Sequence, residues 1–334
     1  YTVGNYQKAY ALAQDQLTLA QRSKDQGLIA KALNNLGNVY ASTSEWNQAI
    51  AIYERSLETF KRVGDMQGQA GTYNNLGLVY TQKGEWDQAI EYYEHSLETF
   101  ERLGDMSGLA QTWGNLGLVY ANKGERDQAI AMYEHSIELS KRIGDVYGVA
   151  STWINLGNVY LQKGEQDQAI EYYQKNLEIS ERVGDVHGVA QTRMGLGNLY
   201  AQKGHWDQAI AMYEQSLKTF ERVGDVHRTA QTWDNLGLVY AQKGKRNHAL
   251  SMFKRSLETF ERLGDVHGMA SAWTNIALLY LKTDRVEEAK PLLARAYKIF
   301  TQLGSPDAQA AANALVQACG SAEAADAYLA GFEE

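Results

Sequence analysis

The segment NLGNVY at residues 35–40 returns in closely similar form along this chain of 334 residues, always at an interval of 40. The later copies begin at residues 75, 115, 155, 195, 235 and 275. A Gly-Asp pair recurs with the same period, from residues 64–65 to residues 264–265, without an insertion. A fixed period of this length predicts a solenoid, in which each unit packs only against its neighbours.

Each unit carries the apolar spacing of two helices, as residues 106–144 illustrate. One face of the first helix, helix A, is marked by Trp113, Leu116, Gly117 and Tyr120. The buried stripe of the second helix, helix B, is marked by Ala129, Tyr133, Ile137 and Ser140. Gly144 can end helix B in a left-handed conformation, and Asp145 can cap the next helix A. Gly117 and Ala129 are expected to let the two helices of a unit approach closely.

The composition fits a helical chain and excludes several classes of protein. Hydrophobic residues make up 44% of the sequence, and its two prolines are Pro291 and Pro306. The single cysteine, Cys319, excludes an intrachain disulfide framework and a thiolate zinc cluster. A net charge of −8 makes nucleic acid a poor partner. No apolar run reaches the ~20 residues of a membrane helix, so we expect a cytoplasmic protein that is not bound to a membrane.

The repeated pattern of aromatic, Leu-Gly, Tyr, Gly and Ala-x-x-x-Tyr resembles the tetratricopeptide repeat. Its signature positions are matched by Trp113, Leu116, Gly117, Tyr120, Ala129 and Tyr133. The 40-residue unit is longer than the common form and is similar to those of Pins/LGN-type scaffolds, of kinesin light chain and of the sensor arrays of bacterial STAND (NLR-like) ATPases. The resemblance covers essentially the whole chain. It implies an all-α solenoid, a right-handed superhelix of antiparallel helix pairs.

The repeat pattern divides the chain into three parts. Residues 1–30 are expected to form a half repeat with helix B alone, residues 31–310 seven complete units, and residues 311–334 the capping helices. The missing helix A would leave Tyr6, Ala9, Tyr10 and Leu17 uncovered, and we expect self-association through this half repeat unless a preceding unit covers it. The chain is therefore interpreted as part of a longer protein.

A search for catalytic chemistry leaves no candidate. Residues 195–200 begin like a dinucleotide-binding loop but lie inside a predicted helix and lack the third glycine. The carboxylates of Glu91, Glu94 and Glu98 share a face that is expected to be solvated. Histidines recur in successive units, as at His187 and His227, too far apart to share a metal ion and expected to be structurally neutral. We predict no catalytic residues, no cofactor and no metal.

The informative residues form a stripe on helix A, which the resemblance places in a concave groove. They comprise an asparagine row, then a mixed row of asparagine and leucine, then a glutamine row: Asn35, Asn75, Asn115, Asn155, Asn235 and Asn275; Asn38, Leu78, Leu118, Asn158, Asn198, Leu238 and Leu278; Gln82, Gln162, Gln202 and Gln242. An amide side chain carries both a donor and an acceptor, so a row of amides can bind an extended peptide backbone. The alternative is that each asparagine bonds neighbouring helices and holds the repeats together. Arg193, which stands where neighbouring units carry tryptophan, is predicted to point outward as a specificity residue.

The sequence thus favours a non-enzymatic module that binds a protein or peptide ligand in this groove. The resemblance suggests the ligand-sensing or partner-recruiting array of a larger signalling protein. The alternative is a structural scaffold that assembles with itself.

Overall fold

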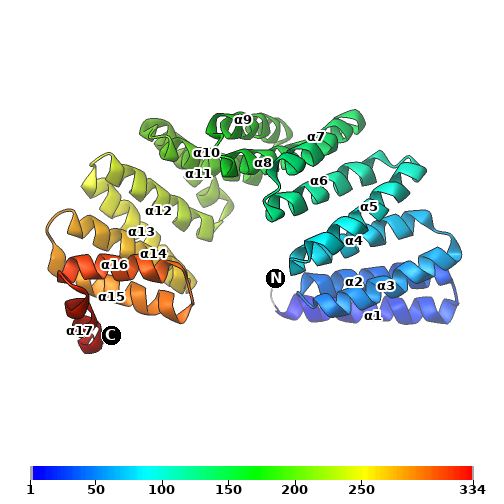
Figure 1. Cartoon of the computed structure of the whole chain (residues 1–334), viewed down its shortest axis with the longest axis horizontal. Helices are drawn as coiled ribbons and strands as arrows, with labels where there is room; N and C mark the ends of the chain where they lie inside the picture. Colours follow the sequence, from blue (N-terminus) through cyan, green and yellow to red (C-terminus); the bar gives the residue numbers. More distant parts are fainter. Residues whose placement is uncertain (1–2, 333–334) are drawn as a thin grey trace. The chain divides into compact units, whose positions relative to one another are not determined.

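The computed structural model describes residues 3–332, and within them it contains helices and no strand (Figure 1). The helices are α1 Val3–Ser23, α2 Gln26–Ser42, α3 Trp46–Val63, α4 Met66–Lys83, α5 Trp86–Leu103, α6 Met106–Lys123, α7 Arg126–Ile143, α8 Val146–Gln162, α9 Gln166–Val183, α10 Val186–Gln202, α11 Trp206–Val223, α12 Val226–Gln242, α13 Arg246–Leu263, α14 Val266–Leu281, α15 Val286–Gln302, α16 Asp307–Cys319 and α17 Ala322–Gly331. The predicted all-α fold of repeated helix pairs is confirmed. Residues 1–2 of the predicted half repeat and residues 333–334 of the predicted cap lie outside the described range.

The predicted turn chemistry sets the helix boundaries. Gly104, with φ 67°, ends α5 in the left-handed conformation. Asp105 then caps α6, and its Oδ1 accepts hydrogen bonds of 3.0 Å from the backbone N–H groups of Ser107 and Gly108. Equivalent aspartates cap α2, α4, α8, α10, α12 and α14. Each Gly-Asp pair therefore ends one helix and begins the next.

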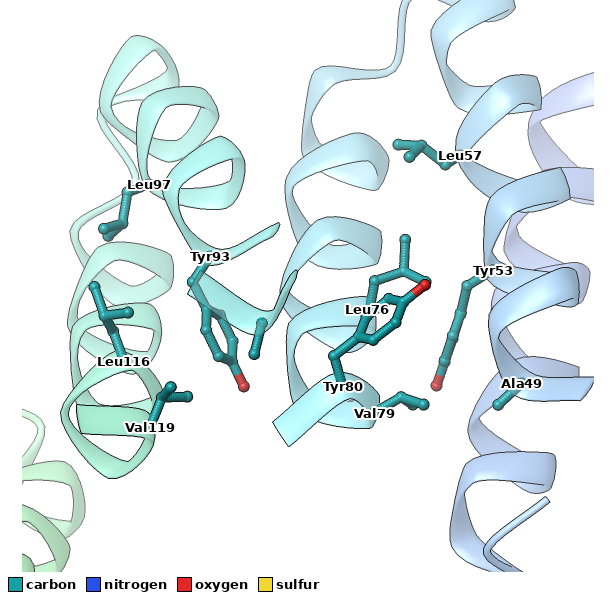
Figure 2. Close-up of a cluster of buried hydrophobic side chains, with 11 residues drawn as sticks. Ala49, Tyr53, Leu57, Leu76, Val79, Tyr80, Tyr93, Leu97, Leu116 and Val119 are labelled. Atoms are coloured by element: carbon teal, nitrogen blue, oxygen red, sulfur yellow. The ribbon is translucent and has the colours of Figure 1, made fainter. Parts of the chain in front are cut away.

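Glycine on helix A and an aromatic ring on helix B pack together in the core of the first six units. A Cβ atom built on Gly117 of α6 would lie 2.7 Å from ring atoms of Tyr133 on α7, closer than real contacts allow. Figure 2 shows the same layering in the two preceding units, where Tyr53 of α3 and Tyr93 of α5 lie among apolar side chains of α4 and α6. The expected close approach of the two helices is confirmed.

The chain divides within α9 into two compact units, residues 1–179 and 180–334. In the first unit α2, α4, α6 and α8 touch in succession, and in the second α10, α12, α14 and α16 do so. Among the described residues, no comparable contact joins α3 to α5 or α5 to α7. Within each unit, the A helices therefore form one continuous face. Helices α2 and α16 cross the bounds predicted at residues 30–31 and 310–311, so complete helices define repeat limits near Asp25 and Ser305.

The uncovered face of α1 differs from the predicted one. Tyr6 donates a hydrogen bond of 2.8 Å to Glu45, and Tyr10 packs edge-on against Tyr40. Tyr6, Tyr10 and Leu17 are partly buried, whereas Ala9 is exposed as predicted. The exposed large side chains are Leu12 at 61% and Leu19 at 63%. The prediction was wrong for the tyrosines because both are held by the first complete repeat.

Candidate binding face on the A helices

The predicted stripe lies on the A helices and is partly open to solvent. Leu78, Leu238 and Leu278 are 38–43% exposed, and Leu118 is half-buried. The four glutamines and the asparagines Asn38, Asn158 and Asn198 are exposed. Most members of the asparagine row are half-buried, namely Asn75, Asn115, Asn155, Asn235 and Asn275, whereas Asn35 is exposed.

Five members of the asparagine row join their A helix to the preceding repeat. Asn115 Nδ2 donates to Asn74 Oδ1 over 3.1 Å, and Asn75 Nδ2 donates to Asn34 Oδ1 over 3.3 Å. The same direction of donation recurs from Asn35 to Gln16, from Asn235 to Asn198 and from Asn275 to Asp234. These five amide groups therefore hold the repeat interface, and the structural alternative has direct support. In these bonds the asparagine oxygens are not used and remain available as acceptors.

Asparagines of the mixed row accept hydrogen bonds from tyrosine, whereas those of the asparagine row donate. Asn38 Oδ1 accepts a hydrogen bond of 2.6 Å from Tyr53, and Asn198 Oδ1 accepts one of 2.6 Å from Tyr213. Asn158 accepts from Tyr173 in the same way. Because their oxygens are engaged, these side chains present N–H donors at the surface. The A-helix face therefore carries amide oxygens of the asparagine row and, in three units, amide N–H groups of the mixed row.

Asn155 is the exception in its row. Its counterparts bond to a side chain at position 34, 74, 198 or 234, but the corresponding positions before Asn155 hold Gly114 and Leu118. Within residues 3–332, the side chain of Asn155 makes no hydrogen bond. The missing side chain at Gly114 opens a cavity of about 340 Å³ between α6 and α8, and Asn115, Ser151 and Asn155 are among its lining residues. This volume lies within the range of ligand pockets, ~300–1,000 Å³.

The side chain of Arg193 does not lie beside the asparagine row. Its Nη2 lies 2.6 Å from Oε1 of Glu181 on α9, and its side chain is only 21% exposed. The prediction that it points outward as a groove residue was wrong, because the tryptophan position of helix A faces helix B. The neighbouring Met194 does line a pocket on the A-helix face.

The recurring histidines form inter-repeat contacts that the sequence analysis missed. His227 Nε2 lies 3.1 Å from Oδ2 of Asp265, the cap of α14, and its ring packs edge-on against Phe260. His267 repeats both contacts, with Asp307 at 3.3 Å and with Phe300. The two histidine side chains are about half exposed, as expected, and their contacts between repeats were not expected. The signal that could have found these pairs is their separation of 38 and 40 residues, which is close to the repeat length.

Two further classes of site are absent from the described part of the chain. No three side chains of His, Cys, Asp or Glu within residues 3–332 come together as metal ligands. None of the helices in that range combines the length and apolarity needed to cross a membrane.

Comparison with known proteins agrees with this geometry. The tetratricopeptide repeat family matches residues 1–62, 68–142, 148–222, 188–262 and 270–302, so the chain belongs to this family, whose repeats are typically protein-interaction modules. A signal transduction ATPase with numerous domains (STAND) and a tetratricopeptide repeat sensor, from Pyrococcus horikoshii, is similar over 97% of this chain at 17% identity and a TM-score of 0.70. This chain spans 52% of that protein.

Two other solved structures share the fold. The apo form of RapI is similar over 94% of this chain and 95% of its own, at 15% identity and a TM-score of 0.67. BtubC from P. vanneervenii is similar over 66% of this chain and 92% of its own, at 21% identity and a TM-score of 0.59. No curated protein matches the chain in sequence. At these identities the structures establish the fold alone.

Proposed function

We propose that the chain is a non-enzymatic module that binds an extended polypeptide segment along its A-helix face. The observation that carries this proposal is Asn155, the one member of the asparagine row with both amide groups unused, beside the cavity that Gly114 opens. The exposed leucines of the mixed row supply apolar contact. The other asparagines hold the repeats, and their unused oxygens accept N–H groups of the ligand.

The free energies involved indicate that the cavity, as well as the amide groups, contributes to binding of the ligand. A hydrogen bond to a backbone group contributes about 0.5–1.5 kcal/mol net, so a few of them give only a few kcal/mol. Lost translational and rotational freedom offsets about 4 kcal/mol or more. A side chain of the ligand in the cavity is therefore needed for stable binding.

The role of the array within a larger protein is also a proposal. The repeat array of the STAND protein is a sensor by its description, and we propose a sensing or partner-recruiting role in a signalling protein for this array. A cytoplasmic location fits the single cysteine.

Site-specific photo-crosslinking tests the proposal. A photoreactive residue at Ser151, which lines the cavity, is expected to crosslink to one segment of a captured partner, and peptide mapping identifies that segment. The same residue at Glu134, exposed on helix B, is the control. Gly114→Asn restores the partner that Asn75 and Asn115 have, fills the cavity and should abolish the crosslink. Equal crosslinking from both positions, or an unaffected Gly114→Asn variant, contradicts the proposal.

A second candidate function is a self-assembling scaffold, and the exposed leucines of α1 favour it. Leu19 and Leu28 border a shallow pocket of about 350 Å³ between α1 and α2. Apolar surface of this kind is a frequent site of association.

A further inference from the structure

Threonine on helix A connects neighbouring repeats through a small polar network. Thr112 Oγ1 lies 3.4 Å from Asn74 Oδ1 and 3.3 Å from Ser96 Oγ, which belong to the preceding unit. Thr72 makes the corresponding contact of 3.3 Å to Asn34. Threonine occupies this position in the second to sixth units, at residues 72, 112, 152, 192 and 232.

The seventh unit breaks this network at two places. Residue 272 is a fully buried alanine without a hydroxyl group, and residue 234 is an aspartate in place of the asparagine. Asp234 Oδ2 accepts a hydrogen bond of 2.9 Å from Asn275. Asp234 Oδ1 and Ser256 Oγ are buried without a hydrogen-bond partner in the described structure. The change to Ala272 accounts for Ser256, whose counterpart Ser96 contacts Thr112. Asn74 uses a single oxygen for both Thr112 and Asn115, so the second oxygen of Asp234 stands where Asn74 has its amide nitrogen.

The surroundings of Asp234 form a pocket within the second compact unit. Its volume is about 540 Å³, and Met194, His227, Asp234, Phe260, Asp265 and His267 are among its lining residues. Asp265 is already engaged by the backbone N–H of Gly268 and by His227. Asp234 is thus the acidic group that lacks a counter-charge, and Met194 and Phe260 supply apolar wall.

We infer that the Asp234 pocket binds the cationic side chain of an arginine or lysine in the polypeptide ligand. A buried carboxylate is costly unless a donor or cation satisfies it, and the chain itself offers only Asn275. The methylene groups of the ligand side chain pack against Met194 and Phe260, while its head group reaches Asp234. The inference rests on the proposed function only in taking the cation from a polypeptide.

A small probe tests this pocket separately from the cavity at Gly114. The protein is labelled at its seven methionine methyl groups, and the Met194 signal is assigned with Met194→Leu. Nα-acetyl-arginine amide is expected to shift the Met194 signal in a saturable manner. Nα-acetyl-citrulline amide, nearly isosteric and neutral, should shift it at least about tenfold more weakly, because charge-assisted hydrogen bonds are the stronger class.

Two variants complete the experiment. Asp234→Asn should weaken binding of the arginine probe about ten- to hundred-fold. Asp234→Asn combined with Ala272→Thr recreates the network of Asn74, Thr112 and Ser96 and leaves no buried group unpaired there. If this double variant binds the arginine probe as weakly as Asp234→Asn does, misfolding is excluded as the cause of the weaker binding. Equal binding of both probes, no binding of the arginine probe, or undiminished binding by Asp234→Asn overturns the inference. If the arginine probe does not bind but Ser151 crosslinks to a partner, the Asp234 inference fails and the proposed function stands. If the probe binds but Ser151 does not crosslink, the proposed function fails and the Asp234 pocket stands.

Discussion

The ring of Tyr133 lies so close to Gly117 that a single added methyl group could not fit between them. The seventh unit shows the complementary solution, with Ala277 on helix A and Leu293 on helix B, both fully buried. The size of the side chain on helix B therefore limits the size of the residue that helix A can carry opposite it.

Gly117→Ala is expected to destabilise the protein. The gain in helix propensity is about 0.5–1 kcal/mol, but overpacking against Tyr133 costs about 1–3 kcal/mol, so the clash outweighs it. Chemical denaturation measures the difference. Gly71→Ala is the matched control, since nothing lies within 4 Å of its added Cβ, and it should stabilise. Adding Tyr133→Leu to Gly117→Ala should recover part of the loss, and no recovery would show that ring contact is not the cause.

Asp105→Ala is expected to lower the free energy of unfolding by about 1 kcal/mol near neutral pH, because α6 loses its cap. The N–H of Gly108, followed by the side chain of Gln67, lowers the pKa of Asp105 below its ordinary value. The folded state thus releases this proton more readily, and the stabilisation is present above the unfolded pKa and lost as the pH falls through the folded one. Urea denaturation of both proteins should therefore show a smaller difference in acid than at neutral pH. Asp105→Asn, which still caps, should be milder.

Asp234 should show the opposite pH dependence. Burial raises its pKa to about 6, so the folded state holds the proton more tightly than the unfolded chain. Ionisation therefore destabilises the fold as the pH rises from about 4 to about 6, and the cost persists above that range. Asp234→Asn should raise the free energy of unfolding at neutral pH by roughly 1–3 kcal/mol. The gain should fall toward zero near pH ~4. His227, Asp265 and His267 line the same pocket and are present in both proteins, so the difference between the proteins isolates Asp234. A constant difference across this range would contradict the assignment.

The two central asparagines should separate stability from binding. Asn115→Ala removes the bond to Asn74 and should cost about 0.5–1.5 kcal/mol of stability. Asn155→Ala removes no internal bond and should cost less than about 0.5 kcal/mol, yet weaken capture of the partner. Melting temperatures and partner affinity measured on both variants check this. A large loss of stability in Asn155→Ala would make this residue structural as well.

Self-association through α1 is tested by replacing Leu12 and Leu19 with glutamine. If these leucines join copies, light scattering should show a mass that rises with concentration for the parent protein and stays monomeric for the variant. Leu103→Gln, at a residue 40% exposed on α5, is the control and should change nothing. Identical masses for parent and double variant would remove α1 from the interface.

The fold could be predicted from the sequence because each repeat carries all of its determinants at fixed spacing. Gly104 and Asp105 mark a helix end and a cap by residue type alone, and Gly117 with Tyr133 marks the close helix contact. The stripe on the A helices was also predictable from the 3.6-residue period.

The polar bonds between repeats were not predictable in the same way. Asn75 and Asn155 occupy equivalent positions, and only the structure shows that the first is bonded and the second is not. The difference arises from Asn34 and Gly114, which lie one repeat earlier and next to the asparagine row. Ala272 could have been noticed as a departure from threonine, but its meaning depends on knowing that Thr112 contacts Asn74 and Ser96.

The bonds of the asparagine row also bear on how the chain folds. The bonds from Asn75 to Asn34 and from Asn115 to Asn74 each join residues 41 apart, which is one repeat plus one residue. Ordering such a contact closes only a short loop, so its entropic cost is the same at every step along the array. Folding can therefore nucleate in any adjacent pair of repeats and spread outward, and unfolding can begin at either end while the middle stays native. Asn155, which lacks this bond, lies at a weaker link, where a bound ligand would join the two sides.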